Sequence, residues 1–406
     1  MLALDARVRL PRELAEDDEG VSALARTVAD ASSATCATER GSIAHIDARA
    51  PRAPAFVLRA PVAREVNAMV WTSDRALWCA VDDRVVELDA RMVSSGEAAD
   101  GGGRAETRAL SGHGDVVNGI DVDVGGRFLA ACDDSGEIVV YELSSGSVTR
   151  RLRGHEGCAT SVAFRRKRGA EGEMLTTATD CRAMKWDHKL KSVPVRTWDA
   201  RKMKSVTDHD RERAGSSDEA GESGDAKQMF NPPMLHSVSV FAGETSEENV
   251  PGLRRAACAA CGDGTVLVFD VDQKPLQPSS FGGSKKSSSS AKSASGGVFR
   301  DGKAECVRLG SDGVSGHTNA VTCAAFVPWL ARGDIVVSGG ADRKLIAWNW
   351  VKAAEAAPSD PDASAAGVMT TVALRRKVND LAFANNVQRI VVADTGPHVS
   401  FYAFRD

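Results

Sequence analysis

Long apolar runs are missing from this chain of 406 residues. The longest ones, such as Ile138–Tyr141 and Ala256–Cys261, have the length of a β-strand. They fall far short of the roughly 18 residues that a membrane-spanning helix needs. The first residues, Met1–Arg7, lack the continuous apolar segment of a secretory signal. We therefore expect an intracellular protein of the cytoplasm, the nucleus or both, with no membrane contact.

Charge of one sign is not in excess either, because 51 Lys and Arg face 55 Asp and Glu for a net charge of -4. Such a balance provides no global positive field for nucleic acid, so no direct nucleic-acid binding is expected. Two short basic runs stand out, Arg165–Arg168 and Lys285–Lys286. Either suits a nuclear import signal or an anionic contact, but a solvated loop is the commoner role for such a run.

Cysteine has no regular spacing, and nine scattered thiols are typical of a reducing compartment. Cys258 and Cys261 form a Cys-x-x-Cys pair, but no second pair of ligands stands at a spacing that would complete a zinc site. We predict buried free thiols at these positions, with a redox or metal role as the lesser alternative. Phosphate-binding loops, dinucleotide fingerprints and EF-hand loops are also missing, so no metal and no cofactor is expected.

What the chain does have is an internal repeat of roughly 40–45 residues, the period of a β-propeller blade. Three segments, beginning at Gly112, Gly154 and Gly316, run from Gly-His through strand-like residues to an aromatic residue. In the last two segments the histidine and the tryptophan are 31 positions apart. This identity of spacing indicates one repeated structural unit.

Four weaker units have the same rhythm of three short runs, each β-branched or small in composition and bounded by Gly, Asp or Asn. The runs are Val21–Arg26, Ser33–Thr38 and Ser42–Asp47; Val66–Trp71, Ala76–Ala80 and Arg84–Asp89; Leu235–Phe241, Ala256–Cys261 and Thr265–Asp270; and Val378–Phe383, Arg389–Asp394 and Val399–Phe404.

Together these units predict a single all-β domain over residues 1–406, a seven-bladed WD40 β-propeller. The expected blades are 20–60, 61–109, 110–152, 153–203, 228–273, 304–352 and 368–406. Four segments poor in apolar residues are predicted to be long, disordered loop insertions, because they bury too little to offset their ordering entropy. These insertions are 94–107, 204–227, 274–303 and 353–367.

The ring must also close. The last unit ends with its third strand, and the strand-like run Ala6–Leu10 precedes the first unit. We predict that this closing strand, residues 6–10, becomes the outer strand of the last blade. Closure leaves only short sheet edges exposed.

Histidine, a hydroxyl residue and aspartate recur together with tryptophan in two repeats, a combination that also suits a hydrolase triad. The two sets are His155, Thr176, Asp180 and Trp186, and His317, Ser338, Asp342 and Trp348. Appearing twice at equal spacing is expected of a structural hydrogen-bond network rather than of one active site. No Gly-x-Ser-x-Gly elbow accompanies them, so we expect no catalytic residue and no enzyme.

An Asp-x-Arg pattern follows the third strand of the first two units. The pairs are Asp47 and Arg49, Asp89 and Arg91, and a near match in the fourth unit, Asp187 and Lys189. The segment Trp198–Arg201 has the same letters outside this register. We predict that the arginine stands at the blade rim with its forked guanidinium free for a partner, the alternative being a solvated charge.

The repeats resemble the WD-repeat family over nearly the whole chain. Four segments, residues 131–138, 161–165, 231–240 and 390–394, together resemble the WD repeat-containing protein 53 family within it. That resemblance implies a substrate receptor of a cullin-4 RING ubiquitin ligase, attached through DNA damage-binding protein 1. The family docks through a Trp-Asp-x-Arg box, where this chain has Ile46 and Leu88 in place of tryptophan.

The expected function is therefore that of a non-enzymatic, monomeric adaptor that docks to the ligase and recruits a client of unknown identity. One alternative is a scaffold in another complex, in chromatin or trafficking, without a ligase role. Another is an enzyme in the central channel, which requires converging polar side chains with perturbed pKa values.

Overall fold

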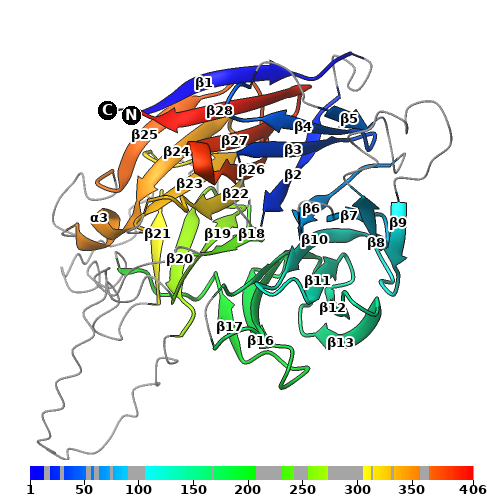
Figure 1. Ribbon diagram of the computed structural model, residues 1–406. Coiled ribbons are helices and arrows are strands. Elements are labelled where there is room, and N and C mark those ends of the chain that lie inside the picture. Colours follow the sequence, from blue (N-terminus) through cyan, green and yellow to red (C-terminus); the bar gives the residue numbers. More distant parts are fainter. Residues whose placement is uncertain are drawn as a thin grey trace, which may run out of the picture.

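The protein is described by a computed structural model in which nearly every element is a β-strand. It describes residues 1–12, 19–27, 32–51, 56–58, 64–73, 76–89, 106–166, 169–206, 231–241, 255–272, 305–311, 314–330, 333–356 and 365–405. Figure 1 shows the sheets set around a common centre. The predicted all-β class, with the sheets of a WD40 propeller, is confirmed.

Four sheets contain four antiparallel strands that follow one another along the chain. They are β10 (Val117–Val122), β11 (Phe128–Asp133), β12 (Glu137–Glu142) and β13 (Ser147–Arg153); β14 (Ala159–Phe164), β15 (Glu173–Ala178), β16 (Arg182–Asp187) and β17 (Arg196–Asp199); β18 (Leu235–Val240), β19 (Ala256–Cys261), β20 (Val266–Asp270) and β21 (Cys306–Leu309); and β22 (Val321–Phe326), β23 (Ile335–Gly340), β24 (Lys344–Asn349) and β25 (Val368–Ala373).

A fifth sheet joins the two ends of the chain. It consists of β26 (Val378–Ala384), β27 (Arg389–Asp394), β28 (His398–Phe404) and the N-terminal β1 (Leu2–Arg9). Strand β1 runs antiparallel to β28 along its whole length, and the two lie uppermost in Figure 1. The predicted closing strand is confirmed, and it begins four residues before the predicted Ala6.

The remaining sheet has eight strands and divides into two runs of four. One run is β2 (Val21–Thr27), β3 (Ser33–Thr38), β4 (Ile43–Asp47) and β5 (Phe56–Leu58); the other is β6 (Ala68–Trp71), β7 (Ala76–Val81), β8 (Arg84–Asp89) and β9 (Glu106–Leu110). The two runs meet where β2 and β6 pair in parallel. The total of seven blades and the blade boundaries stay predictions.

The inner strands β2, β6, β10, β14, β18, β22 and β26 form a closed circuit, in which each contacts the next and β26 contacts β2. Polar side chains near their first residues bond to the backbone of the following strand. Side-chain groups donate from Ser22 to Val66, Asn67 to Val117, Asn118 to Ala159, Thr160 to Leu235, Thr322 to Val378 and Asn379 to Val21, at 2.7–3.0 Å. All inner strands therefore begin on one face of the ring, here called the strand-start face, and end on the strand-end face.

The strands of the four weaker units begin and end within two residues of their predicted bounds. Three predicted insertions need correction at their margins. Residues 106–107 belong to β9, Ser205 forms a β-bridge with Cys306, and residues 353–355 belong to the helix α3 (Trp350–Glu355). Within the predicted insertions, residues 94–105, 207–227, 274–303 and 357–364 lie outside the described residues.

Helix α3 forms where the sequence predicted the start of a loop. The side chain of Asn349 caps it by accepting a hydrogen bond from the Lys352 N–H, which satisfies a backbone donor of the first turn. Trp350 is buried, and its indole N–H donates to the Gly333 carbonyl at 2.9 Å. The Asn349 cap is a local contact, and the bond from the Trp350 indole to Gly333 is a longer-range one. Composition reveals neither of them.

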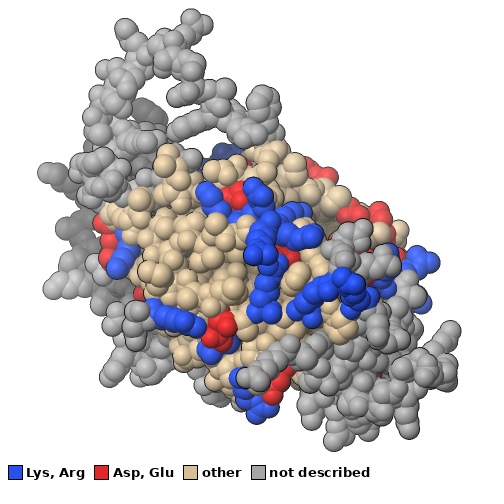
Figure 2. Space-filling model, turned by 90° about the horizontal axis from the view of Figure 1, so that it is seen from above, with Lys and Arg blue, Asp and Glu red and all other residues tan. Residues whose placement is uncertain are grey.

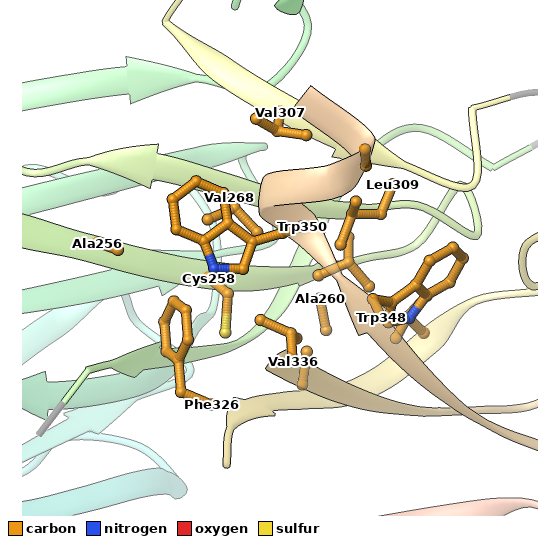
Figure 3. Close-up of a cluster of buried hydrophobic side chains, with 14 of the residues drawn as sticks. Ala256, Cys258, Ala260, Val268, Val307, Leu309, Phe326, Val336, Trp348 and Trp350 are labelled. Carbon is orange, nitrogen blue, oxygen red and sulfur yellow. The ribbon is translucent and has the colours of Figure 1, made fainter. Parts of the chain in front are cut away.

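The core is divided among the interfaces between neighbouring sheets. One such cluster contains Trp348, Trp350, Phe326, Val268 and Cys258, with Phe326 and Trp350 next to the Cys258 thiol (Figure 3). Removing apolar surface from water stabilises the folded state by about 25 cal/mol per Å². Each sheet is therefore stabilised chiefly by its two neighbours.

Within the described residues, no helix has the length and apolar character needed to cross a membrane.

Candidate protein-binding rim

The pair Asp47 and Arg49 lies on the strand-end face, where β4 ends. The Arg49 Nε–H donates to Asp47 Oδ1 at 2.9 Å and its Nη2–H to Oδ2 at 2.7 Å. The Arg49 backbone N–H also donates to Asp47 Oδ1 at 2.9 Å. This fork-to-fork arrangement, here called the Asp-x-Arg clasp, holds the guanidinium in one orientation.

The clasp is open to solvent. The Arg49 side chain is 68% exposed, and the hydrogen bonds from Arg49 lower the pKa of Asp47 to about 2. The carboxylate therefore stays charged, and the clasp intact, at any physiological pH. The prediction of a free guanidinium at this rim is wrong, because Nε and Nη2 both donate to Asp47, while Nη1 takes no part in the clasp.

The other predicted rim pairs differ. Asp89 ends β8 in the same position, but Arg91 lies outside the described residues. Asp187 ends β16, and its Oδ1 accepts a hydrogen bond from the Lys189 backbone N–H at 3.0 Å. Lysine has no planar fork, so this third pair keeps the turn and lacks the bidentate clasp.

Asp199 and Arg201 form a second complete Asp-x-Arg clasp, although the sequence placed this pair outside the register of the other pairs. Arg201 donates from Nε and Nη2 to the two oxygens of Asp199, both at 2.8 Å, and its backbone N–H donates to Oδ1 at 3.0 Å. Asp199 ends the outer strand β17, beside Arg182 at the beginning of β16, and thus lies on the strand-start face. The clasp is a local feature of Asp-x-Arg after a strand, whichever face the strand reaches.

Behind the rim, the structure brings together the four members of the first His-containing set. The Trp186 indole N–H donates to Thr176 Oγ1 at 2.8 Å, and Thr176 Oγ1 bonds to His155 Nε2 at 2.8 Å. His155 Nδ1 bonds to Asp180 Oδ2 at 3.1 Å. Burial alone would raise the pKa of Asp180, but the hydrogen bonds from His155 and the Glu156 N–H lower it.

The second set repeats this geometry. Trp348 Nε1 donates to Ser338 Oγ at 2.8 Å, Ser338 Oγ bonds to His317 Nε2 at 2.8 Å, and His317 Nδ1 bonds to Asp342 Oδ1 at 2.9 Å. Both hydroxyls are fully buried and are occupied on each side by a member of the set. An attacking hydroxyl must reach a substrate, and these two lie inside the blade.

The basic run that begins at Arg165 is not a solvated loop. The Arg165 side chain is 2% exposed, and its guanidinium donates to Asp272 at 2.8 and 2.9 Å and to Glu173. Arg166 pairs with Asp121 at 3.2 Å. These two arginines bind neighbouring sheets together; Lys167 and Arg168 lie outside the described residues.

The ring encloses a cavity of about 350 Å³ near the strand-end face, lined by residues of the inner strands. Its carboxylates bond to the next inner strand: Asp121 accepts the Phe164 N–H at 2.7 Å and Asp380 accepts the Leu24 N–H at 2.9 Å. Both carboxylates thus link neighbouring inner strands.

Cys258 and Cys261 are buried free thiols, and burial raises the pKa of each. Within the part of the chain that the structure describes, no cluster of three or more His, Cys, Asp or Glu side chains is placed to hold a metal ion.

The family model of the WD domain, G-beta repeat, matches residues 104–142 and 308–349. This chain carries WD40 repeats. Both matched segments contain strands described above, and the second contains His317. The chain is also similar to the WD repeat-containing protein 53 homolog of Dictyostelium discoideum, with 24% identity over 207 residues. The match covers 51% of this chain and 50% of that relative, which confirms the resemblance that the sequence showed.

One of the two matched WD repeats has an incomplete hydrogen-bond set. His113 Nδ1 bonds to Asp133 Oδ2 at 2.7 Å, but His113 Nε2 is buried and has no hydrogen-bond partner among the described residues. Ala131 lies six residues before β12, as Thr176 lies six before β16, and it supplies no hydroxyl. Tyr141 takes the place of tryptophan and donates to the Ser111 carbonyl instead.

Restoring the hydroxyl in this WD repeat is expected to stabilise the protein. We expect Ala131→Ser to raise the free energy of unfolding by about 1 kcal/mol, because it gives the buried imidazole nitrogen a partner. Denaturant-induced unfolding followed by tryptophan fluorescence measures the change. Ala131→Val, which adds bulk without a hydroxyl, is the control; equal stabilisation by both variants would contradict the hydrogen-bond explanation.

Proposed function

We propose that this WD-repeat protein is a substrate receptor of a cullin-4 RING ubiquitin ligase and docks to DNA damage-binding protein 1 through its strand-end face. WD repeats are scaffolds for protein interactions, and the repeats of this chain support that general role. The observation that carries the finer proposal is the exposed clasp of Asp47 and Arg49. Its fixed guanidinium suits a carboxylate or backbone carbonyl of a partner.

The missing tryptophan of the docking box does not weaken this proposal. Ile46, Leu88 and Trp186 precede the aspartate in the three rim pairs, and all three are fully buried. A buried residue packs within its blade and does not reach a partner. An aliphatic residue can therefore replace tryptophan here, while the aspartate and the arginine remain at the surface.

The test is co-purification of the full chain with DNA damage-binding protein 1. We expect Arg49→Ala combined with Arg91→Ala to lower recovery about tenfold, since an interface arginine contributes more than 1 kcal/mol to binding. Arg201→Ala is the matched control, because it removes the same clasp from the opposite face. We expect it to leave recovery unchanged.

Circular dichroism and unfolding of each variant show whether the fold is retained. Unchanged recovery with the folded Arg49 and Arg91 double variant would refute docking through this rim. No recovery of DNA damage-binding protein 1 with the unaltered chain would refute the ligase role and favour a scaffold in another complex.

A further inference from the structure

The strand β25 forms the outer edge of its sheet. Its inner side pairs with β24 in antiparallel register, and Figure 1 shows it on the outside of the ring. Among the described residues, no strand and no isolated bridge pairs with its other side. An edge strand presents backbone N–H and C=O groups with which a further strand can pair. This outer side is here called the β25 edge.

The hydrogen-bond register identifies the backbone groups that lie at the β25 edge. The Leu374 N–H donates to the Arg343 carbonyl at 2.7 Å, directly beyond Ala373, the last residue of the strand. In an antiparallel ladder, hydrogen-bonded and non-hydrogen-bonded pairs alternate. Val372 therefore bonds to β24, whereas Thr371 and Ala373 direct their N–H and C=O groups away from β24.

The β25 edge has no charge of its own. Its sequence, Val-Met-Thr-Thr-Val-Ala, contains no Lys, Arg, Asp or Glu. Every other outer strand of four or more residues in the described chain has at least one arginine; examples are Arg7 in β1, Arg108 in β9, Arg150 in β13, Arg196 in β17 and Arg308 in β21. In Figure 2, seen from above β1, Lys and Arg side chains gather in a band across this side of the molecule. Charges on an edge strand oppose pairing with another chain, and β25 lacks this protection.

The side chains of β25 also suit a neighbouring strand. Exposure alternates along it, and the exposed residues are Met369, Thr371 and Ala373. Four of the six residues are valine or threonine, which favour strand pairing. On the other face Val372 packs against the core between this sheet and the next one. The strand is therefore fixed in place, and its edge is formed before any partner arrives.

We propose that the β25 edge binds an extended, uncharged segment of a partner protein, which adds as a fifth strand to the sheet of β22–β25. Thr371 and Ala373 supply the backbone hydrogen bonds, and small or β-branched side chains of the partner pack beside Met369. The sheet that carries the Asp47 and Arg49 clasp is separated from this one by the sheet of β26–β28 and β1. The proposal therefore goes beyond docking at the rim and does not depend on it.

A segment of a partner fits this edge better than a second copy of the chain. Pairing of β25 with its own copy would rest on six residues from each molecule. Their contact area is well below the roughly 1,000 Å² that a stable interface between folded proteins needs. A partner segment can be held here together with a contact elsewhere on the ring, so that the two contacts reinforce each other.

Fluorescence anisotropy with the full-length protein tests the proposal. The probe is a fluorescein-labelled peptide, Thr-Val-Thr-Val-Thr-Val, with a lysine at each end for solubility. The comparison peptide has the same sequence with N-methyl groups on its two central residues, which removes one N–H donor from each of its edges. We expect the unmodified peptide to bind and the methylated one to bind at least about tenfold more weakly, a difference of about 1.4 kcal/mol.

Two changes in the protein block the same edge. Thr371→Pro removes an N–H that points away from β24, a position at which an edge strand tolerates proline. Thr371→Lys introduces the kind of charge that the other outer strands have. Each is expected to weaken peptide binding about tenfold. Thr197→Lys is the matched control, because Thr197 is exposed in the outer strand β17. We expect it to change binding by less than roughly twofold.

Hydrogen exchange of the full chain, with and without the peptide, locates the contact. We expect protection confined to residues 368–374. The proposal would be overturned by failure of the unmodified peptide to bind, by equal affinity for the methylated peptide, by equal loss with Thr197→Lys, or by protection elsewhere only. A dimer of the unaltered chain that Thr371→Lys abolishes would overturn the partner segment in favour of a second copy; size-exclusion chromatography with light scattering measures it.

Discussion

Replacing Asp272 with alanine is expected to lower the free energy of unfolding by about 3 kcal/mol, because it leaves buried positive charge without its partner. Arg165 and Lys185 are nearly buried, and both donate to Asp272, at 2.8 Å and 3.0 Å. Glu173 alone would then face two cations. The measurement is denaturant-induced unfolding of the full chain.

This ion cluster joins two sheets. Arg165 and Lys185 belong to the sheet of β14–β17, while Asp272 follows β20 in the next sheet. Removing both members of the Arg165–Asp272 pair, with Arg165→Met and Asp272→Ala together, is expected to cost less than the sum of the single changes. Strict additivity of the two changes would show that the side chains contribute independently.

The same cluster has a pH dependence. Burial opposes ionisation of Asp272, but hydrogen bonds from Arg165 and Lys185 outweigh it and hold the pKa of Asp272 well below its ordinary value of 3.8. A pKa depressed by folding contributes stability that is complete above the unfolded-state pKa and is lost as the pH falls below it. Asp272→Asn is therefore expected to flatten the loss of stability below about pH 4.

Replacing Thr176 with valine is expected to cost about 3 kcal/mol of stability, since one hydroxyl serves two buried groups. Valine keeps the shape and removes the acceptor for the Trp186 indole N–H and the partner of His155 Nε2. Each stranded group costs about 1–3 kcal/mol when no water replaces the bond. Thermal and chemical unfolding of the variant measure the loss.

The matched control for this change is Thr197→Val. Thr197 lies on β17 of the same sheet, paired with Met184, and is exposed. We expect it to alter stability by less than about 0.5 kcal/mol. Equal small effects at both threonines would mean that the buried network contributes little. The hydroxyl of Ser338 occupies the equivalent position in the other set, so Ser338→Ala is expected to repeat the Thr176 result.

Strand positions could be predicted closely because the signal is local. In a strand, alternate residues face opposite sides, so short runs of small and β-branched residues between turn residues identify it. The burial of Cys258 and Cys261 and the pairing of the N-terminal strand followed from the same pattern. Helix α3 could not be predicted this way, because its anchor is the bond between Trp350 and the distant Gly333.

The candidate sites were predicted less completely. The residues of the Asp-x-Arg pairs were identified, but the clasp was not, because the orientation of a guanidinium depends on which acceptor lies nearest. For the same reason Arg165, predicted as part of a solvated loop, proved to be buried against Asp272, a residue 107 positions away along the chain. The pair Asp199 and Arg201 was not predicted as a rim pair, because its position in the repeat differs from that of the other Asp-x-Arg pairs.

The sequence by itself determined the repeat, the strands within it and the aspartates and arginines at strand ends, since these depend on neighbouring residues. Only the tertiary structure decided which charges meet. Ring closure places Arg9 beside His398 and the segment 375–377, and it separates the clasp of Arg49 from that of Arg201 by the depth of the ring. Electrostatic interaction depends on distance in space, and that distance is set by closure of the sheets.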